Sequence, residues 1–154
     1  MSTEITFTMI KPDAMANNTA GGIIQMITDA GFRLSAMKFL WLSEERTREF
    51  YKEHEGKEFY EPLIGFMTSG PIIAMVLEKE NAVADYRKFI GTTDPETAEE
   101  GTIRKKYATN TRLNAVHGSD SVETALKEAA FFFKDSEIFD KKGNQLLSFA
   151  KKDA

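Results

Sequence analysis

Residues 114–121 carry the sequence Asn-Ala-Val-His-Gly-Ser-Asp-Ser, which is the most informative stretch of the chain. The apolar residues that precede His117 predict a short strand over residues 113–116, with the histidine at its end. Asp120, followed by Glu123 three positions later, predicts the start of a helix because this spacing is typical of a capping box. The stretch therefore predicts a strand, a turn and a helix, with an imidazole at the turn.

The segments around this stretch predict strands and helices in alternation. Apolar runs or alternating apolar and polar residues predict further strands over residues 5–9, 33–42 and 72–77, the second with both faces at least partly covered. Helical spacing and polar caps predict helices over residues 19–30, 43 to beyond 51, 59–67 and 81–90, and one from 120 onwards. This order fits an α+β sandwich, in which helices cover one face of a small sheet.

The remaining segments are a loop and a tail. Residues 92–112 are polar without clear periodicity, and so long a loop inside a compact domain is usually functional or disordered. Residues 134–154 are lysine-rich and are expected to be irregular. The length of 154 residues predicts a single domain over residues 1–154, with its core over about residues 4–133.

Composition and charge narrow the classes of function. The formal net charge is −4, which disfavours nucleic acid and anionic membranes as partners. The chain has no cysteine, so disulfides and thiolate chemistry are excluded. The sequence has neither a signal segment nor an apolar run of membrane-spanning length. We therefore expect a cytoplasmic protein that binds neither nucleic acid nor membrane.

The chain has two histidines, His54 and His117. The default interpretation of a lone histidine is a core residue whose ring bonds a backbone carbonyl. Two features favour a chemical role for His117: Gly118 leaves room beside the ring, and the predicted helix start attracts anions and favours the neutral, nucleophilic imidazole. His54 lies in a charged segment and is expected at the surface.

Several cations could serve an anionic substrate. Lys11 follows the first predicted strand, and Arg87, Arg104 and Arg112 lie in or near the long polar segment. Each alone is most simply a solvated surface charge, whereas together they could form a phosphate clamp, because arginine offers paired donors to phosphate oxygens. The chain has neither a GxxxxGK[ST] loop nor a GxGxxG fingerprint, so any nucleotide binding uses another device.

The pattern Asn114-x-x-His117-Gly118-Ser119-Asp120-Ser121 resembles the active-site signature of the nucleoside diphosphate kinases. Other segments resemble the family in the same order; they are residues 8–13, 31–34, 37–38, 69–71 and 101–104. The resemblance covers about residues 4–133. It implies a ferredoxin-like βαββαβ fold with a small antiparallel sheet covered by helices. It also implies reversible ping-pong transfer of the γ-phosphoryl group from a nucleoside triphosphate to a diphosphate, through a phosphohistidine on His117.

The resemblance further implies which residues contact the phosphates. Lys11, Arg87 and Arg104 match the family's phosphate contacts, and Lys11 is expected to take part in catalysis as well as in binding. Asn114 and Thr93 match residues that hydrogen-bond the sugar and the phosphates. Lys105 and Lys106 depart from the family pattern and are most simply solvated charges.

Around the imidazole, the resemblance implies that Glu128 orients the ring, that Ser119 joins this network, and that Tyr51 lies near the transferring phosphate. The residues that match the base-binding slot are Phe59, Leu63 and Thr111. Stacking without readout of base edges predicts broad base specificity. The family often has an apolar residue in place of Thr111, so we expect a more polar slot here.

Mg²⁺ is the cofactor that the resemblance implies, held mainly by nucleotide phosphates rather than by protein ligands. Self-association is also implied, with a hexamer favoured over a tetramer because the tail is retained. A nucleotide-binding or scaffolding protein that kept the fold without catalysis is the alternative. The presence of Lys11, Arg104, Asn114 and His117 together argues against such a decayed site.

Overall fold

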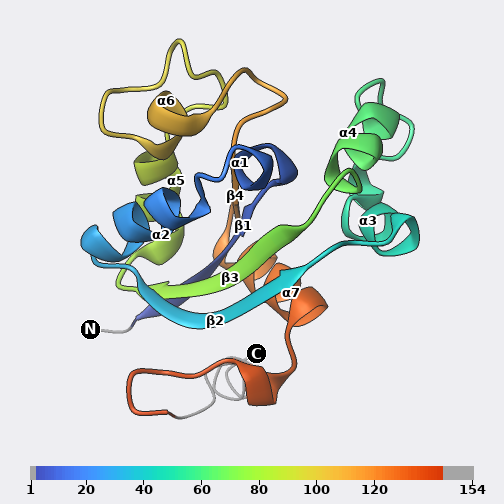
Figure 1. Ribbon diagram of the computed structural model, residues 1–154. Coiled ribbons are helices and arrows are strands. Elements are labelled where there is room, and N and C mark those ends of the chain that lie inside the picture. Colours follow the sequence, from blue (N-terminus) through green and yellow to red (C-terminus); the bar gives the residue numbers. More distant parts are fainter. Residues whose placement is uncertain (1–2, 144–154) are drawn as a thin grey trace.

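The two inner strands of the sheet come from apolar segments. In the computed structural model, which describes residues 3–143, β1 (Glu4–Ile10) lies between β3 (Ile72–Lys79) and β4 (Val116–Gly118), and β2 (Arg33–Leu40) flanks β3. All neighbouring strands are antiparallel, which gives the order β2-β3-β1-β4 (Figure 1). Residues 72–77 are buried throughout, as expected for a continuous apolar run in a central strand.

Helices and short 3₁₀ turns connect the strands and follow the last one. In chain order they are α1 (Pro12–Ala16), α2 (Ala20–Asp29), α3 (Glu44–Phe50), η1 (Lys52–His54), α4 (Tyr60–Met67), α5 (Ala82–Ile90), α6 (Ile103–Tyr107), α7 (Val122–Phe132) and η2 (Asp135–Glu137). Within residues 3–143, no helix has both the length and the apolar character that a membrane crossing requires.

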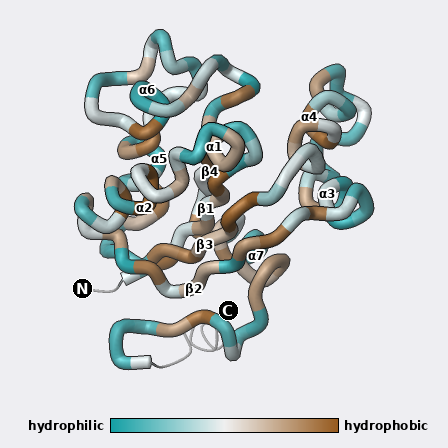
Figure 2. Tube along the Cα trace, in the orientation of Figure 1, coloured by the Kyte–Doolittle hydropathy of each residue, from teal (hydrophilic) through white to brown (hydrophobic). Residues whose placement is uncertain are grey.

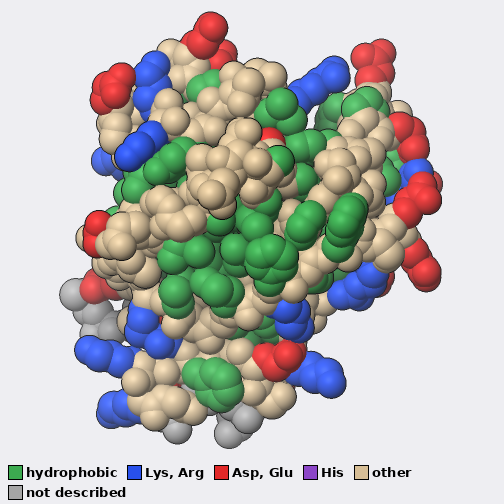
Figure 3. Space-filling model, viewed as in Figure 1, with side chains coloured by type: hydrophobic (Ala, Val, Ile, Leu, Met, Phe, Trp, Pro, Cys, Tyr) green, Lys and Arg blue, Asp and Glu red, His purple; other side chains and the backbone are tan. Residues whose placement is uncertain are grey.

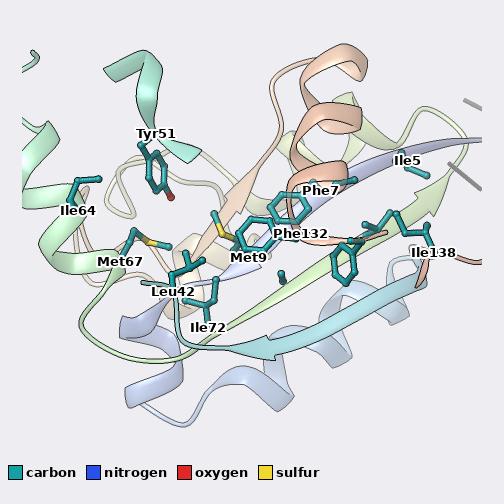
Figure 4. Close-up of a cluster of buried hydrophobic side chains, with 14 of the residues drawn as sticks. Ile5, Phe7, Met9, Leu42, Tyr51, Ile64, Met67, Ile72, Phe132 and Ile138 are labelled. Carbon is teal, nitrogen blue, oxygen red and sulfur yellow. The ribbon is translucent and has the colours of Figure 1, made fainter. Parts of the chain in front are cut away.

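Two hydrophobic clusters lie on opposite faces of the sheet. On one face, Phe7 and Met9 of β1 pack with Phe132 of α7 and with the apolar side of α4 (Figure 4). On the other face, Met75 of β3 packs with α2 and α5, through residues such as Ile27. Along the trace, hydrophobic residues accordingly gather on the strands and on the helix sides that face them (Figure 2).

This arrangement confirms the α+β, ferredoxin-like βαββαβ fold. α2 connects β1 to β2 and α5 connects β3 towards β4, while α3 and α4 are added between β2 and β3. The expectation that helices cover only one face of the sheet is wrong. The inner strands are buried on both sides, and α7 covers the face that α2 and α5 leave open (Figure 1).

The boundaries around His117 differ from the prediction. The last strand covers Val116–Gly118 instead of residues 113–116, because it pairs with β1 in the register Met9↔His117. The following helix begins after Ser121, whose Oγ accepts the Thr124 N–H at 3.0 Å, and not at Asp120. Val122, the first residue of this helix, is 44% exposed.

Three other helices were missed or misplaced, the first of them α1, which has five residues and follows β1. The polar segment 92–112 contains α6, which is capped by the Thr102 hydroxyl accepting the Lys105 N–H at 3.2 Å. A helix of five residues is too short to show a period in the sequence. α3 ends at Phe50, and the chain continues past Tyr51 as a 3₁₀ turn.

The edge strand β2 is less covered than predicted. Met37 and Phe39 are 47% and 66% exposed, so one face of this strand is open. Part of the tail lies against the same strand, where the Phe139 N–H donates to the Ser35 carbonyl at 3.0 Å. The part of the tail beyond residue 143 lies outside the described residues.

Candidate active site

His117 lies inside β4, with its peptide fixed by the neighbouring strand. It pairs with Met9 of β1, and the Thr8 hydroxyl donates to the His117 carbonyl at 2.6 Å. Its side chain is 19% exposed, so the ring is reachable and is not a core histidine. Gly118 has a packing role that the sequence did not indicate, because a Cβ there would stand 2.9 Å from Cδ1 of Ile90.

A carboxylate fixes the orientation of the imidazole. Nε2 of His117 lies 3.0 Å from Oε1 of Glu128 on α7. The same carboxylate oxygen accepts a hydrogen bond from Ser119 Oγ at 2.5 Å, and this hydroxyl also accepts the Phe7 N–H at 3.3 Å. Because a carboxylate only accepts, the neutral imidazole carries its proton on Nε2 and keeps a lone pair on Nδ1. The network therefore leaves one ring nitrogen free to act as a nucleophile.

Aromatic rings support the imidazole from behind. The rings of Phe7 and Phe50 each lie 5.9 Å from the His117 ring, and Phe50 meets it edge to face. Tyr51 follows Phe50 and is buried, and both its burial and the nearby Glu128 carboxylate raise the pKa of its hydroxyl above the ordinary value. Sequence reasoning missed Phe7 and Phe50, because apolar residues in a strand and a helix give no signal beyond core packing.

Lys11 is buried at the C-terminal end of β1, where the chain enters α1. Its Nζ donates to Oδ1 of Asn114 at 2.9 Å. Burial, and then the nearby Arg104, lower the pKa of Lys11 from 10.5 to about 8, although Asp13 opposes this shift. The ammonium is thus compensated by a neutral amide rather than paired with a carboxylate, which leaves its charge available to an anion.

Arg104, on α6, ties the segment 92–112 to the strand that carries the histidine. Its guanidinium donates to the backbone carbonyls of Gly91 at 3.0 Å, Asn114 at 3.3 Å and Val116 at 2.8 Å. Burial lowers the pKa of Arg104 to about 10. A guanidinium has more N–H donors than these three bonds use, so some of its donors stay available to an anion.

A cavity of about 580 Å³ extends from His117 towards α4. Lys11 and Tyr51 line it near the histidine, and Phe59, Leu63 and Thr111 belong to the same lining. Asn114 and Arg112 line it as well. The structure thus brings the residues of the expected base slot and four of the expected cationic and polar groups into one cavity with the imidazole.

A second cavity, of about 230 Å³, lies on another side of the imidazole. Its lining includes Arg87 and Glu128 together with two further carboxylates, those of Glu53 and Asp120. Arg87 Nη1 donates to the Gly118 carbonyl at 3.4 Å. His117 therefore stands between a mainly apolar slot and a smaller charged one.

One expectation about a single residue needs correction, and another stays a prediction. His54 is half-buried rather than a surface residue, since it lines the smaller cavity and its ring lies 5.2 Å from Phe59. Thr93, expected to bind nucleotide, lines neither of the two cavities that contain His117. It lies in the segment between α5 and α6, which reaches the site instead through Arg104.

The family model of nucleoside diphosphate kinase matches residues 4–138 of the chain. The chain belongs to the nucleoside diphosphate kinase family. It is therefore a phosphotransferase that binds nucleotides and transfers phosphoryl groups between them, as the signature around His117 indicated.

Curated nucleoside diphosphate kinases are similar along most of their length. The chain is 51% identical to the one from Histophilus somni strain 2336 over 139 residues, which cover 90% of this chain and 99% of the relative. It is 53% identical to the one from Flavobacterium psychrophilum over 139 residues, which cover 90% of this chain and all of the relative.

Solved nucleoside diphosphate kinases share the fold. The Aquifex aeolicus enzyme superposes with a TM-score of 0.86 at 38% identity, covering 89% of this chain and 99% of that one. The Halobacterium salinarum enzyme, solved in complex with CDP, also gives a TM-score of 0.86 at 38% identity, covering 90% of this chain and 93% of that one.

Proposed function

We propose that this chain transfers the γ-phosphoryl group of a nucleoside triphosphate to a nucleoside diphosphate through a phosphohistidine on His117. The observation that carries the proposal is the Glu128–His117 hydrogen bond of 3.0 Å, because it leaves Nδ1 of a partly exposed imidazole as a free base. The second histidine, His54, has no carboxylate hydrogen bond within the described residues, so it lacks the same orientation.

The reaction has two half-steps. Nδ1 attacks the γ-phosphorus, the bond from that phosphorus to the βγ-bridging oxygen breaks, and its electron pair leaves with the nucleoside diphosphate. An acceptor diphosphate then attacks the phosphohistidine with a terminal β-oxygen, and the P–N electron pair returns to Nδ1. The bonds to oxygen that break and form are equivalent, so the transfer runs in either direction.

The cations supply the charge stabilisation that phosphoryl transfer needs more than covalent chemistry. Lys11 lines the same cavity as His117, and its ammonium donates a hydrogen bond to the neutral amide of Asn114. Arg87 lines the smaller cavity beside the ring, and Arg104 is anchored to the carbonyls on either side of Ala115. We assign these three side chains to the phosphates, and Ser119 to the orientation of Glu128.

The larger cavity suits the nucleoside. Phe59 is 45% exposed at the start of α4, so its ring can stack on a base, with Leu63 and Thr111 beside it. Asn114 and Tyr51 line the same cavity and are assigned to the sugar and phosphates. Thr93 is assigned there by family resemblance alone. A stacking slot without base-edge readout accepts purines and pyrimidines alike.

Mg²⁺ is the cofactor we propose, bound mainly through the nucleotide phosphates. Mg²⁺ in such sites usually combines phosphate oxygens with one or two carboxylates, and Glu53 and Asp120 line the smaller cavity with His117. The residues present therefore fit the ion. When bound, it supplies neutralisation of phosphate charge. Cytoplasmic action is part of the same proposal, supported by a chain without cysteine.

We further propose that the chain self-associates through the open face of β2. Met37, Phe39 and Trp41 are 47%, 66% and 64% exposed, and hydrophobic side chains gather over this strand (Figure 3). Exposed apolar side chains that gather in one patch often mark an interface. A second copy of the chain is the proposed partner, in a hexamer rather than a tetramer. Light scattering tests the assembly, and Phe39→Asp should reduce the measured mass.

Steady-state kinetics test the catalytic proposal. With ATP and a second nucleoside diphosphate varied together, a phosphoenzyme mechanism predicts parallel double-reciprocal lines. His117→Ala should abolish transfer while circular dichroism stays unchanged. His54→Ala is the matched control, and it should keep the parallel pattern. Intersecting lines in the wild type, or transfer by a folded His117→Ala variant, would exclude the proposed intermediate.

A further inference from the structure

Ala115, two residues before His117, has an unusual backbone conformation. Its φ is +71°, in the left-handed region that residues with a Cβ rarely adopt. The Val116 N–H donates to the Asn114 carbonyl at 2.8 Å, which closes a three-residue turn around Ala115. A γ-turn with a positive central φ is the rarer and more strained of the two forms. Strain of this kind persists only where the surroundings hold it in place.

The segment that follows β1 holds this turn on both sides. The Lys11 N–H donates to the Ala115 carbonyl at 2.8 Å. Oδ2 of Asp13 accepts the Ala115 N–H at 3.0 Å. Both polar backbone groups of Ala115 are thus bonded to residues more than a hundred positions earlier in the chain. Only the second of these bonds uses a side chain, so only Asp13 is open to test by substitution.

The N–H of Ala115 depends on this carboxylate because the residue is fully buried. Without an acceptor, a buried N–H bears its full desolvation cost. The turn would then lose the hydrogen bond that offsets the strain of a positive φ at Ala115. Relaxation of Ala115 to an ordinary φ would redirect the chain on either side of it.

The groups on either side of the turn belong to the proposed site. The Asn114 side chain accepts from Nζ of Lys11 at 2.9 Å. The carbonyls of Asn114 and Val116 accept from Arg104 at 3.3 Å and 2.8 Å. The turn therefore sets the positions of two cations relative to the strand that carries the imidazole.

We propose that Asp13 is a positioning residue for phosphoryl transfer: its carboxylate holds the γ-turn at Ala115, and the turn places the two cations against His117. The inference rests on the proposed role of His117. It goes beyond that role by assigning a function to a side chain that neither lines the cavities containing His117 nor needs to touch the nucleotide.

Asp13 has a second effect, through its charge. Its other oxygen, Oδ1, is buried and has no hydrogen-bond partner within residues 3–143. The carboxylate raises the pKa of Lys11, against the larger effects of burial and of Arg104 that lower it. An amide at position 13 would still accept the Ala115 N–H but would not support the ammonium. Position 13 can therefore be varied to separate the hydrogen bond from the charge.

A four-variant cycle tests the hydrogen bond. Asp13→Ala should lower kcat/KM at pH 7 by about 10- to 100-fold, the loss expected for one hydrogen bond to a charged group. Ala115→Gly alone should cost little, because glycine adopts a positive φ readily. In the Asp13→Ala background, Ala115→Gly should recover at least about threefold, because the turn no longer needs the carboxylate to offset its strain. Losses that simply multiply in the double variant would overturn the proposal.

Asp13→Asn tests the charge. This variant should keep most of the activity at pH 7, while its alkaline loss of kcat/KM should begin at a lower pH than in the wild type. A variant that merely loosened the fold would lower activity without changing the pH at which kcat/KM begins to fall. If kcat/KM of Asp13→Asn fell at the same alkaline pH as in the wild type, Asp13 would have no effect on Lys11 through its charge.

A structural readout separates this inference from the proposed function. Crystal structures of Asp13→Ala and of Asp13→Asn should show a relaxed φ at Ala115 in the first and a retained positive φ in the second. A positive φ in Asp13→Ala would overturn the positioning role even if His117 is the nucleophile. Conversely, failure of the wild type to form a phosphohistidine would overturn the proposed function and leave the measured turn geometry unaffected.

Discussion

Nζ of Lys11 donates to Oδ1 of Asn114 at 2.9 Å, and both side chains are buried. The partner of the ammonium is a neutral amide, so the pair retains a full positive charge next to the imidazole. Burial costs the charged form free energy, which explains why the pKa of Lys11 falls to about 8. A phosphate that enters the cavity would add negative charge to the weaker support that the Asp13 carboxylate gives the ammonium.

This pKa predicts an alkaline limit to activity. As pH rises through about 8, Lys11 of the free enzyme loses its proton and its attraction for phosphate. The value of kcat/KM should therefore fall above that pH, because this ratio reports the titration of the free enzyme. Lys11→Arg keeps the cation at all accessible pH values. The activity of Lys11→Arg, although lower than that of the wild type, should show no decline near pH 8. A decline there would mean that a group other than Lys11 causes the alkaline loss of activity.

The same pKa predicts that the protein becomes more stable, although less active, as pH rises. The pKa of Lys11 is about 8 in the folded protein and 10.5 when unperturbed, so between these values the unfolded chain binds more protons. The contribution of Lys11 to the free energy of unfolding therefore rises with pH in this window. Below it, Lys11→Met should stabilise the fold by about 1–3 kcal/mol while removing activity. Denaturant unfolding at pH 7 measures this difference, and a destabilised Lys11→Met would contradict it.

Glu128 and Ser119 should differ in importance. Glu128→Gln removes the charge that holds the proton on Nε2 and should lower kcat by about 10- to 1000-fold, the range of a charge-assisted bond at a reacting group. Ser119→Ala leaves the His117–Glu128 bond in place and should cost about tenfold or less. Rapid-quench measurement of the first half-reaction gives both rates. Equal losses in the two variants would contradict this difference in importance.

Phe59 should affect all nucleotides alike. Stacking on an aromatic ring contributes about 1–3 kcal/mol per base, so Phe59→Ala should raise KM about 10- to 100-fold for purine and pyrimidine diphosphates. Phe59→Trp keeps a stacking surface and serves as the control. A loss confined to one class of base would mean that the slot reads base edges, and the broad specificity proposed above would be wrong.

The signature around His117 predicted the family, the fold class and most of the cavity lining. Lys11, Phe59, Leu63, Thr111 and Asn114 line one cavity with the histidine, as expected. This succeeded because the matching segments fix both the strands and the residues at their ends. Local boundaries were less predictable: β4 takes its register from pairing with β1, which a three-residue strand cannot reveal alone.

Other features depend on contacts between distant parts of the chain. The sequence shows Asp13 and Ala115 but not the 3.0 Å bond between them, nor the positive φ that this bond accompanies. Thr93 matched the family pattern yet lines neither cavity with His117. The helix cover on both faces of the sheet was missed because amphipathic patterns give the apolar side of a helix and not the face on which it docks.

The most direct test of the central claim is the intact mass of the enzyme after incubation with MgATP and no acceptor, followed by peptide mapping at alkaline pH. We predict the addition of one phosphoryl group, located on His117 and released by any nucleoside diphosphate. A folded, active enzyme that gains no phosphoryl group, or gains it on a residue other than His117, would contradict the account.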